Sequence, residues 1–241
     1  MEPAEKLDQE IQTAQTESAE QPEPAAVQTE TDVQEKEEKP EKEHFLSDLM
    51  DIAEAGILTM FLVMLVFTYI VRPVSVDGSS MNPTLLHLDR ILVVRPLYEP
   101  KNGQIIVIDD QKSGIFSDAS QQTVQETTGS GMVLVKRLIA KAGQEIDIDF
   151  DTGEVKVDGK LLNEPYIADP TTRDEGAFQY PFTVPEGYVF AMGDNRLHSM
   201  DSRDPSVGLL PEDEILGTAL VRFDRDDENC SKFTDRFDYL F

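Results

Sequence analysis

The chain has 241 residues, enough for one or two domains, and it is strongly acidic, with 47 Asp and Glu against 21 Lys and Arg and a formal net charge of −26. This charge balance argues against a basic surface that binds nucleic acid. The single cysteine, Cys230, excludes an intrachain disulfide, and nothing near it indicates an activated thiol. We therefore expect Cys230 to be a small packing residue.

Residues 1–44 form the first segment, which is rich in Glu, Gln, Thr, Ala and Pro and poor in large apolar side chains. Such a composition cannot bury enough apolar surface to offset the entropy that is lost on ordering. We therefore expect a disordered acidic tail over residues 1–44.

An uncharged apolar run follows, AGILTMFLVMLVFTYIV, from Ala55 to Val71. Its length is near the lower limit for crossing a bilayer, and it is apolar on all sides, unlike an amphipathic surface helix. The run begins too far along the chain for an ordinary signal peptide, and no small-x-small cleavage site follows it. We predict one uncleaved transmembrane anchor over residues 45–73. A buried core helix is the alternative, and the flanking lysines and arginines do not decide the orientation.

Residues 74–241 contain short runs rich in β-branched side chains, separated by Gly and Pro turns, without a comparable helical pattern. Strands are expected at 90–94, 104–109, 132–140, 145–149, 154–162, 177–184 and in the segments YVFAM and TALVRF. The small polar residues 110–131 are expected to form a long, mobile loop. The alternating Phe178, Tyr180 and Phe182 are expected in the core. We predict a mainly β domain over residues 74–241.

The stretch VDGSSMNPTL, residues 76–85, follows the apolar run and contains a tight turn that a glycine permits. Such a turn can present a serine hydroxyl together with free backbone N–H groups. A serine hydroxyl is a weak nucleophile until a base takes its proton. The sequence must therefore supply a base if Ser79 or Ser80 is to act as a nucleophile.

Two bases are available. In VLVKRLI, Lys136 shares a strand face with Leu134 and Leu138, and burial among apolar side chains lowers the pKa of a lysine. A lysine at a sheet edge, with its ammonium in water, explains the same pattern equally well. His198 allows a second arrangement, a triad of Ser80, His198 and Asp201, and a surface histidine is the plainer interpretation of that residue.

A polar stretch over residues 191–208, AMGDNRLHSMDSRDPSVG, follows an expected strand. Charge density of this kind is typical of a solvated loop. The functional alternative is a shell that orients the base, in which Ser199 hydrogen-bonds a lysine and Asp201 pairs with Arg203. The chain shows no metal-binding cluster, phosphate-binding loop or nucleotide motif, so no metal and no cofactor are expected.

The segments GSSMNPTL, VKRLIAKAG and GDNRLHSMDSR, in this order after an anchor, resemble the motifs of bacterial type I signal peptidases. LNEPYI (162–167) and VPEGYVFAMGDNR (184–196) resemble flanking segments of those enzymes, and the likeness covers residues 45–225. It implies that Ser80 is the nucleophile and Lys136 the general base. It also implies that Ser199 positions the lysine, and that Asp201 and Arg203 support the site.

Two positions depart from the family pattern. Some members carry a serine two residues before the nucleophile, where its hydroxyl helps the oxyanion hole, and this chain has Gly78 there. Glycine resembles the Gram-positive pattern and leaves backbone donors, with the Ser80 N–H as the first candidate. Leu197 and His198 replace two residues that are usually polar, which we expect the site to tolerate. Met81, next to the nucleophile, is expected to lie near the substrate.

The resemblance implies a fold with a β-rich catalytic core, preceded by one transmembrane helix and a disordered tail. It implies a single-pass plasma-membrane enzyme, with the tail cytoplasmic and residues 74–241 extracytoplasmic, that removes signal peptides from preproteins after small-x-small motifs. Its partners would be preprotein signal peptides and membrane lipid, with a secretion translocon as a further candidate and no nucleic acid. Alternatives are a relative that matures one substrate, such as a pilin subunit, an inactive membrane-anchored binding protein, and a self-cleaving repressor-like protease.

Overall fold

The computed structural model describes residues 41–95, 99–223 and 238–240. The predicted tail therefore falls almost wholly outside the described residues, and so does Cys230. The expectations for these two features stay predictions.

Helix α1 spans Glu41–Tyr69, and its segment Phe45–Tyr69 has a mean hydropathy of 2.0 with none of its apolar window buried. By length and composition this helix can cross a membrane, whereas a core helix would be covered by protein. It begins four residues before the predicted boundary at residue 45. It ends before residue 73, because the chain enters strand β1 (Val71–Ser75) and a residue that precedes proline, here Arg72, disfavours the helical conformation.

The larger sheet has eight antiparallel strands in the order β1-β2-β11-β3-β4-β9-β10, with β12 paired to β11. Most of these strands were predicted, and their local β-branched composition is the reason. Their bounds are β2 Arg90–Val94, β3 Ile105–Phe116, β4 Val124–Lys141, β9 Tyr188–Met192, β10 Leu210–Pro211, β11 Ile215–Phe223 and β12 Asp238–Tyr239. A short 3₁₀ helix, Glu212–Glu214, joins β10 to β11.

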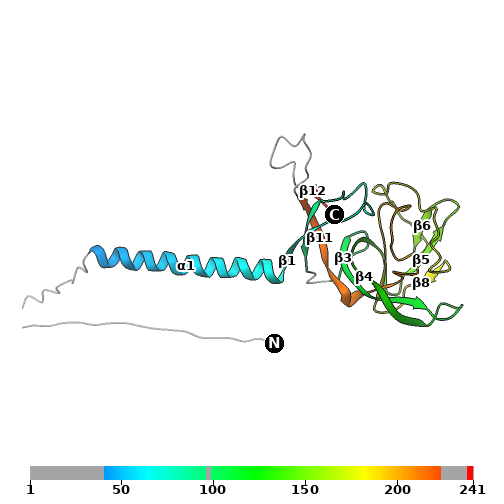
Figure 1. Ribbon diagram of the computed structural model, residues 1–241, viewed down its shortest axis with the longest axis horizontal. Coiled ribbons are helices and arrows are strands. Elements are labelled where there is room, and N and C mark those ends of the chain that lie inside the picture. The colour runs from blue at the N-terminus through cyan, green and yellow to red at the C-terminus, as the bar shows by residue number, and fades with distance from the viewer. Residues whose placement is uncertain (1–40, 96–98, 224–237, 241) are drawn as a thin grey trace, which may run out of the picture. The chain divides into compact units, whose positions relative to one another are not determined.

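The smaller sheet has four strands in the order β7-β6-β5-β8. Its bounds are β5 Glu145–Asp149, β6 Glu154–Val157, β7 Lys160–Leu161 and β8 Phe182–Thr183. The segment 154–162 forms a hairpin of β6 and β7, and Asp158 and Gly159 between them both have positive φ, as a two-residue turn requires. In Figure 1, β5, β6 and β8 gather at one end of the β domain, away from β11 and β12. The mainly β fold is confirmed.

The core of the smaller sheet is aromatic. Phe178, Phe182 and Phe190 are buried there, and Phe116 meets Phe178 and Phe182 edge to face. The aromatic alternation is therefore core, as predicted. The expected strand over residues 177–184 is nevertheless confined to Phe182–Thr183, because Pro181 has no N–H to donate to a ladder.

The predicted loop over residues 110–131 is wrong. Strands β3 and β4 continue into this segment and pair from Lys112 with Thr128 to Phe116 with Val124, beyond a bulge near Asp110. Each arm satisfies the backbone hydrogen bonds of the other, so small polar residues can form strands although only part of the hairpin, such as Ser113 and Gly114, is buried. A hairpin with much of its surface exposed has a loop-like composition, and for this reason the hydrophobic pattern did not reveal it.

Candidate active site

Ser80 lies in the connection between β1 and β2, which folds back on itself. The Val76 N–H donates to Asp89 O at 2.8 Å, and the Leu88 N–H donates to Val76 O at 2.9 Å. Gly78 has a φ of +98°, which other residues rarely adopt. Met81 and Leu85 are buried in the cluster beneath, so the residues on either side of the turn are anchored.

Lys136 comes from β4, where it pairs with Ile106 of β3. Only 3 % of Lys136 is exposed, and Leu134 and Leu138 on the same face are buried too, as strand alternation predicted. The Nζ of Lys136 and the Oγ of Ser80 form a hydrogen bond of 2.8 Å. The fold therefore brings together the two residues to which the sequence assigned nucleophile and base.

Burial among apolar side chains lowers the pKa of Lys136 to about 8. The negative charges of Asp201 and Asp194 oppose this shift, and the positive charge of Arg203 reinforces it. Desolvation is the largest of these effects. A substantial share of Lys136 is therefore neutral, and able to accept a proton, at mildly alkaline pH.

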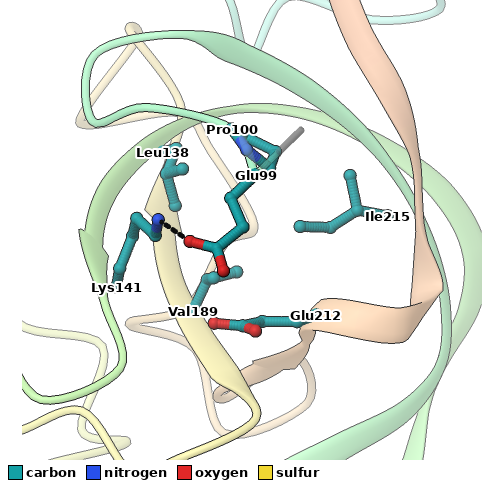
Figure 2. A pocket seen from close by; sticks show the side chains of 7 residues that line it. All are labelled: Glu99, Pro100, Leu138, Lys141, Val189, Glu212 and Ile215. Carbon is teal, nitrogen blue, oxygen red and sulfur yellow. Dashed lines mark hydrogen bonds and ion pairs between the residues drawn. The ribbon is translucent and has the colours of Figure 1, made fainter. Parts of the chain in front are cut away.

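Lys141 on the same strand shows what a lysine with a carboxylate partner looks like. Its Nζ donates to Glu99 Oε2 at 2.8 Å, at one wall of a cavity of about 190 Å³ (Figure 2). The cavity is also lined by Leu138, Val189 and Ile215, but neither Ser80 nor Lys136 lines it. Lys136 has no hydrogen-bonded carboxylate among the described residues, and this difference leaves its amine available to the serine.

The loop that begins at Gly193 clamps the serine turn. The Asn195 N–H donates to Ser80 O at 3.0 Å, and Asn195 Nδ2 donates to Ser79 O at 3.1 Å. A Cβ on Gly193 would collide with Ser80 O and with the Ser199 side chain, so only glycine allows this close approach. The predicted polar loop is therefore a packed support and not a solvated surface segment.

Asp201 and Arg203 form the expected pair, and both side chains are fully buried. The Arg203 Nη2 donates to Asp201 Oδ2 at 2.9 Å, and the Gly193 N–H donates to the same oxygen at 2.9 Å. Burial opposes ionisation of Asp201, but these hydrogen bonds and the charge of Arg203 hold its pKa below the ordinary value. The pair fixes the loop that carries Asn195.

A second buried pair, Arg137 with Asp194, was missed in the sequence. The Arg137 Nε and Nη2 donate to the two Asp194 oxygens at 2.7 and 2.6 Å, and the Thr84 Oγ1 donates to Asp194 Oδ2 at 2.5 Å. This pair joins β4, the loop after β9 and the serine connection. The sequence did contain a signal for this pair. Arg137 stands beside Lys136 in an apolar segment of β4, and an arginine that is buried requires a partner.

Arg196 is a further buried arginine of the loop after β9. Its side chain is fully buried, Nη2 donates to Glu164 Oε1 at 2.5 Å, and Nη1 donates to Thr171 Oγ1 at 2.6 Å. This contact attaches the loop after β9 to residues 164–171. The LNEPYI segment, whose function the sequence left open, thus supplies an anchor for the same loop.

Ser199 is buried, and its Oγ has no hydrogen-bond partner of good geometry among the described residues, although its hydroxyl helps to lower the pKa of Asp201. Its expected hydrogen bond to Lys136 is absent, so the positioning role stays a prediction. His198 is exposed, and Asp201 bonds Arg203 instead, so the alternative triad does not form.

The remaining assigned residues flank Ser80. Met81 is 1 % exposed and packs into the core, a position that gives it a packing role and does not support its expected contact with substrate. The Gly78 N–H donates to His87 Nδ1 at 3.1 Å, so this donor is already engaged. Within the described ranges, no group of three or more His, Cys, Asp or Glu side chains could hold a metal ion.

Comparison with known proteins places these features in a family. The model of the family described as signal peptidase, peptidase S26, matches residues 49–223. Signal peptidase I T of Bacillus subtilis (strain 168) is 34 % identical over 184 residues, which cover 72 % of this chain and 84 % of that protein. A probable signal peptidase I of Mycobacterium leprae is 31 % identical over 220 residues, covering 73 % and 76 %.

A crystal structure of a signal peptidase I from Enterococcus faecalis V583 is 23 % identical and covers 51 % of this chain and 98 % of that chain, with a TM-score of 0.34. The family model spans the anchor, the serine turn, β4 and the loop after β9 in one continuous match. The chain belongs to the signal peptidase family, peptidase S26.

Proposed function

We propose that this chain is a membrane-bound serine endopeptidase that removes N-terminal signal peptides from secreted preproteins, with Ser80 as nucleophile and Lys136 as general base. The observation that carries the proposal is the 2.8 Å hydrogen bond between Lys136 Nζ and Ser80 Oγ in a chain of the signal peptidase family. The lowered pKa of Lys136 supports the assignment of the base.

The reaction is an acyl transfer. Neutral Lys136 takes the proton of Ser80 Oγ, the oxygen attacks the scissile carbonyl carbon, and a tetrahedral oxyanion forms. The Lys136 ammonium then gives its proton to the leaving amine, and the carbon–nitrogen bond breaks. A water molecule, deprotonated by Lys136, attacks the acyl-serine ester. The bond between the acyl carbon and Ser80 Oγ then breaks, Oγ takes the proton back from the Lys136 ammonium, and the signal peptide leaves with a carboxyl terminus.

The oxyanion needs donors that are not already engaged. Because the Gly78 N–H donates to His87, we assign the Ser80 N–H as the backbone donor and give Gly78 a supporting role in the turn. One such donor stabilises a transition state by about 2.7–4 kcal/mol. The Asn195 N–H donates a hydrogen bond to the Ser80 carbonyl oxygen and thereby orients the turn.

The substrate fits an open edge of β4. This strand pairs with β3 along Val133–Lys136, whereas its pairing with β9 begins only at Arg137. No other strand pairs with that edge among the described residues, so an extended peptide can add to it as a strand. An apolar cavity of about 380 Å³, lined in part by Val74, Val107 and Val133, is a candidate receptor for small side chains near the cleavage site.

The membrane places enzyme and substrate together. Helix α1 would span the bilayer once, with the tail on the cytoplasmic side and the β domain outside, next to membrane lipid. A preprotein held in the same membrane would present its cleavage site at the outer surface. A secretion translocon is a further candidate partner.

The alternative functions make different predictions about the site and about cleavage. An inactive binding protein has no need of a buried lysine bonded to a serine, and this contact favours the enzyme. The family match over the anchor and the β domain likewise favours a signal peptidase over a soluble repressor-like protease. A relative that matures a single substrate would have the same geometry as a general enzyme, so a panel of preproteins is needed to separate them.

The full chain, solubilised in detergent, is expected to cut preproteins after small-x-small motifs. Incubation with several purified preproteins, followed by N-terminal sequencing of the products, gives the cleavage site. Matched substrates with a bulky residue at position −1 should remain intact, since the proposed specificity requires a small side chain there. Cleavage of a single preprotein would indicate the specialised relative. No cleavage of any preprotein would contradict the proposed activity.

The rate of cleavage is expected to rise with pH. Only neutral Lys136 accepts a proton, so kcat/KM should climb through the pKa of about 8 and level off above it. Folding stability should also rise between pH 8 and 10.5, because the unfolded chain keeps this proton up to the ordinary value of 10.5 while the folded chain loses it earlier. Rate profiles and denaturation curves from pH 6 to 10 test both. A rate independent of pH in this range would exclude Lys136 as the base.

A further inference from the structure

A histidine outside the proposed dyad contacts the serine turn. His87, near the end of the connection between β1 and β2, accepts a hydrogen bond through Nδ1 from the Gly78 N–H at 3.1 Å. Gly78 stands two residues before Ser80 and has a φ of +98°. A glycine in this conformation has no side chain to restrain it, so the bond to His87 restrains the turn at Gly78, in addition to the bonds that Asn195 makes to Ser79 and Ser80.

The same nitrogen has a second neighbour. His87 Nδ1 lies 3.3 Å from Asp77 Oδ1. A neutral Nδ1 can accept from the Gly78 N–H, whereas a protonated Nδ1 has no lone pair and must donate, for which Asp77 is the adjacent acceptor. The contact with Gly78 requires an Nδ1 without a proton, whereas donation to Asp77 requires an Nδ1–H, as in the other neutral tautomer or the cation.

Solvent reaches this histidine, and the backbone near it is fixed. The side chains of His87 and Asp77 are 56 % and 96 % exposed, so the ring can exchange its proton with water. The connection itself is pinned, because the Leu86 N–H donates to Asp89 Oδ2 and Asp89 forms an ion pair with Arg222 of β11. Asp77 is the charged group next to the His87 ring, and Asp89, Arg222, Asp194 and Lys136 contact the connection at other residues. The His87 ring contacts the turn at Gly78, whereas Asp89 and Arg222 hold the end of the connection.

We propose that His87 is a positioning residue for the nucleophile turn, and that protonation of His87 releases the Gly78 N–H and loosens the placement of Ser80. This inference rests on the proposed peptidase function of Ser80 and Lys136. Acid then lowers activity through two effects. Protonation of Lys136 removes the base, and protonation of His87 breaks its hydrogen bond with the Gly78 N–H.

Comparison of the wild type with two variants, His87→Asn and His87→Ala, separates this role from a merely structural one. In His87→Asn, the amide oxygen can accept from the Gly78 N–H in place of Nδ1 and does not titrate. In His87→Ala, the acceptor is gone at every pH. At pH 8 we expect His87→Ala to lower kcat by about fivefold with KM unchanged, the loss that corresponds to one neutral hydrogen bond. His87→Asn should restore most of that loss and show a shallower fall in kcat below pH 7 than the wild type.

An NMR titration of the Ser80→Ala variant tests the coupling without any need for cleavage. In the full chain labelled with ¹⁵N-glycine and ¹⁵N-histidine in detergent micelles, the Gly78 amide and the His87 ring are expected to shift with one midpoint. With His87→Asn added, the Gly78 shift should lose its pH dependence. The ring of His198, which is exposed and makes no contact with Gly78, serves as the internal control.

The outcomes are distinct. A Gly78 amide that does not respond while the His87 ring titrates would overturn the inference, whether or not the protein cleaves preproteins. Identical kcat profiles for the wild type, His87→Ala and His87→Asn would overturn it as well. Absence of all cleavage, together with coupled Gly78 and His87 shifts, would refute the peptidase function and leave the link between histidine and turn supported.

Discussion

Replacing Lys136 with methionine is expected to lower kcat/KM for preprotein cleavage by about 10²–10⁴-fold, the usual contribution of a general base. Methionine has nearly the same length and is apolar, so it fills the buried site and removes only the amine. The side chain is almost fully buried, and the loss therefore cannot come from exposed charge. The measurement is initial-rate cleavage of a preprotein by the detergent-solubilised full chain.

Two variants complete this experiment. Lys141→Met removes the other lysine of β4, at the end of the strand, where it is paired with Glu99, and should leave the rate close to that of the wild type (Figure 2). Ser80→Ala removes the nucleophile and should be silent. If Lys136→Met still cut while His198→Ala did not, the base would be histidine and the role assigned to Lys136 would be wrong.

Removing one member of the Asp201–Arg203 pair is expected to lower the free energy of unfolding by about 3–5 kcal/mol, because the remaining charge would stay buried without a partner. Both side chains have no exposed surface, and Arg203 also donates to Arg196 O at 2.8 Å. Arg203→Met should therefore destabilise the β domain strongly. Thermal or denaturant unfolding of the full chain, followed by near-UV circular dichroism, gives the change.

A double variant and a surface control make this result specific. Asp201→Leu combined with Arg203→Met should cost less than the sum of the single changes, because no unpaired charge remains. Arg173→Met breaks an ion pair with Glu175 in which the arginine side chain is 56 % exposed, and we expect a loss of at most about 1 kcal/mol. A single Arg203→Met variant as stable as Arg173→Met would contradict the structural role of the buried pair.

Short sequence patterns correctly predicted the strands and the helix whose formation depends on neighbouring residues in the chain. The expected strands at residues 90–94 and 145–149 match β2 and β5 residue for residue, because β-branched side chains favour the pleated backbone over short ranges. The anchor helix was visible as an uninterrupted apolar run. The prediction for segment 110–131 was wrong because its strands are stabilised by pairing with each other, and amino-acid composition does not indicate that pairing.

The sequence by itself determined that Lys136 lies on an apolar strand face, that Ser80 follows a glycine turn, and that an acidic chain carries one membrane-length helix. Only the tertiary structure shows that Lys136 Nζ lies 2.8 Å from Ser80 Oγ and that His198 is exposed, an arrangement that supports lysine as the proposed base. It also revealed the Arg137–Asp194 pair and the contact of His87 with Gly78. Such contacts join residues on different elements or different turns. They depend on strand register and loop closure, which cooperative packing of the whole domain sets and no short pattern encodes.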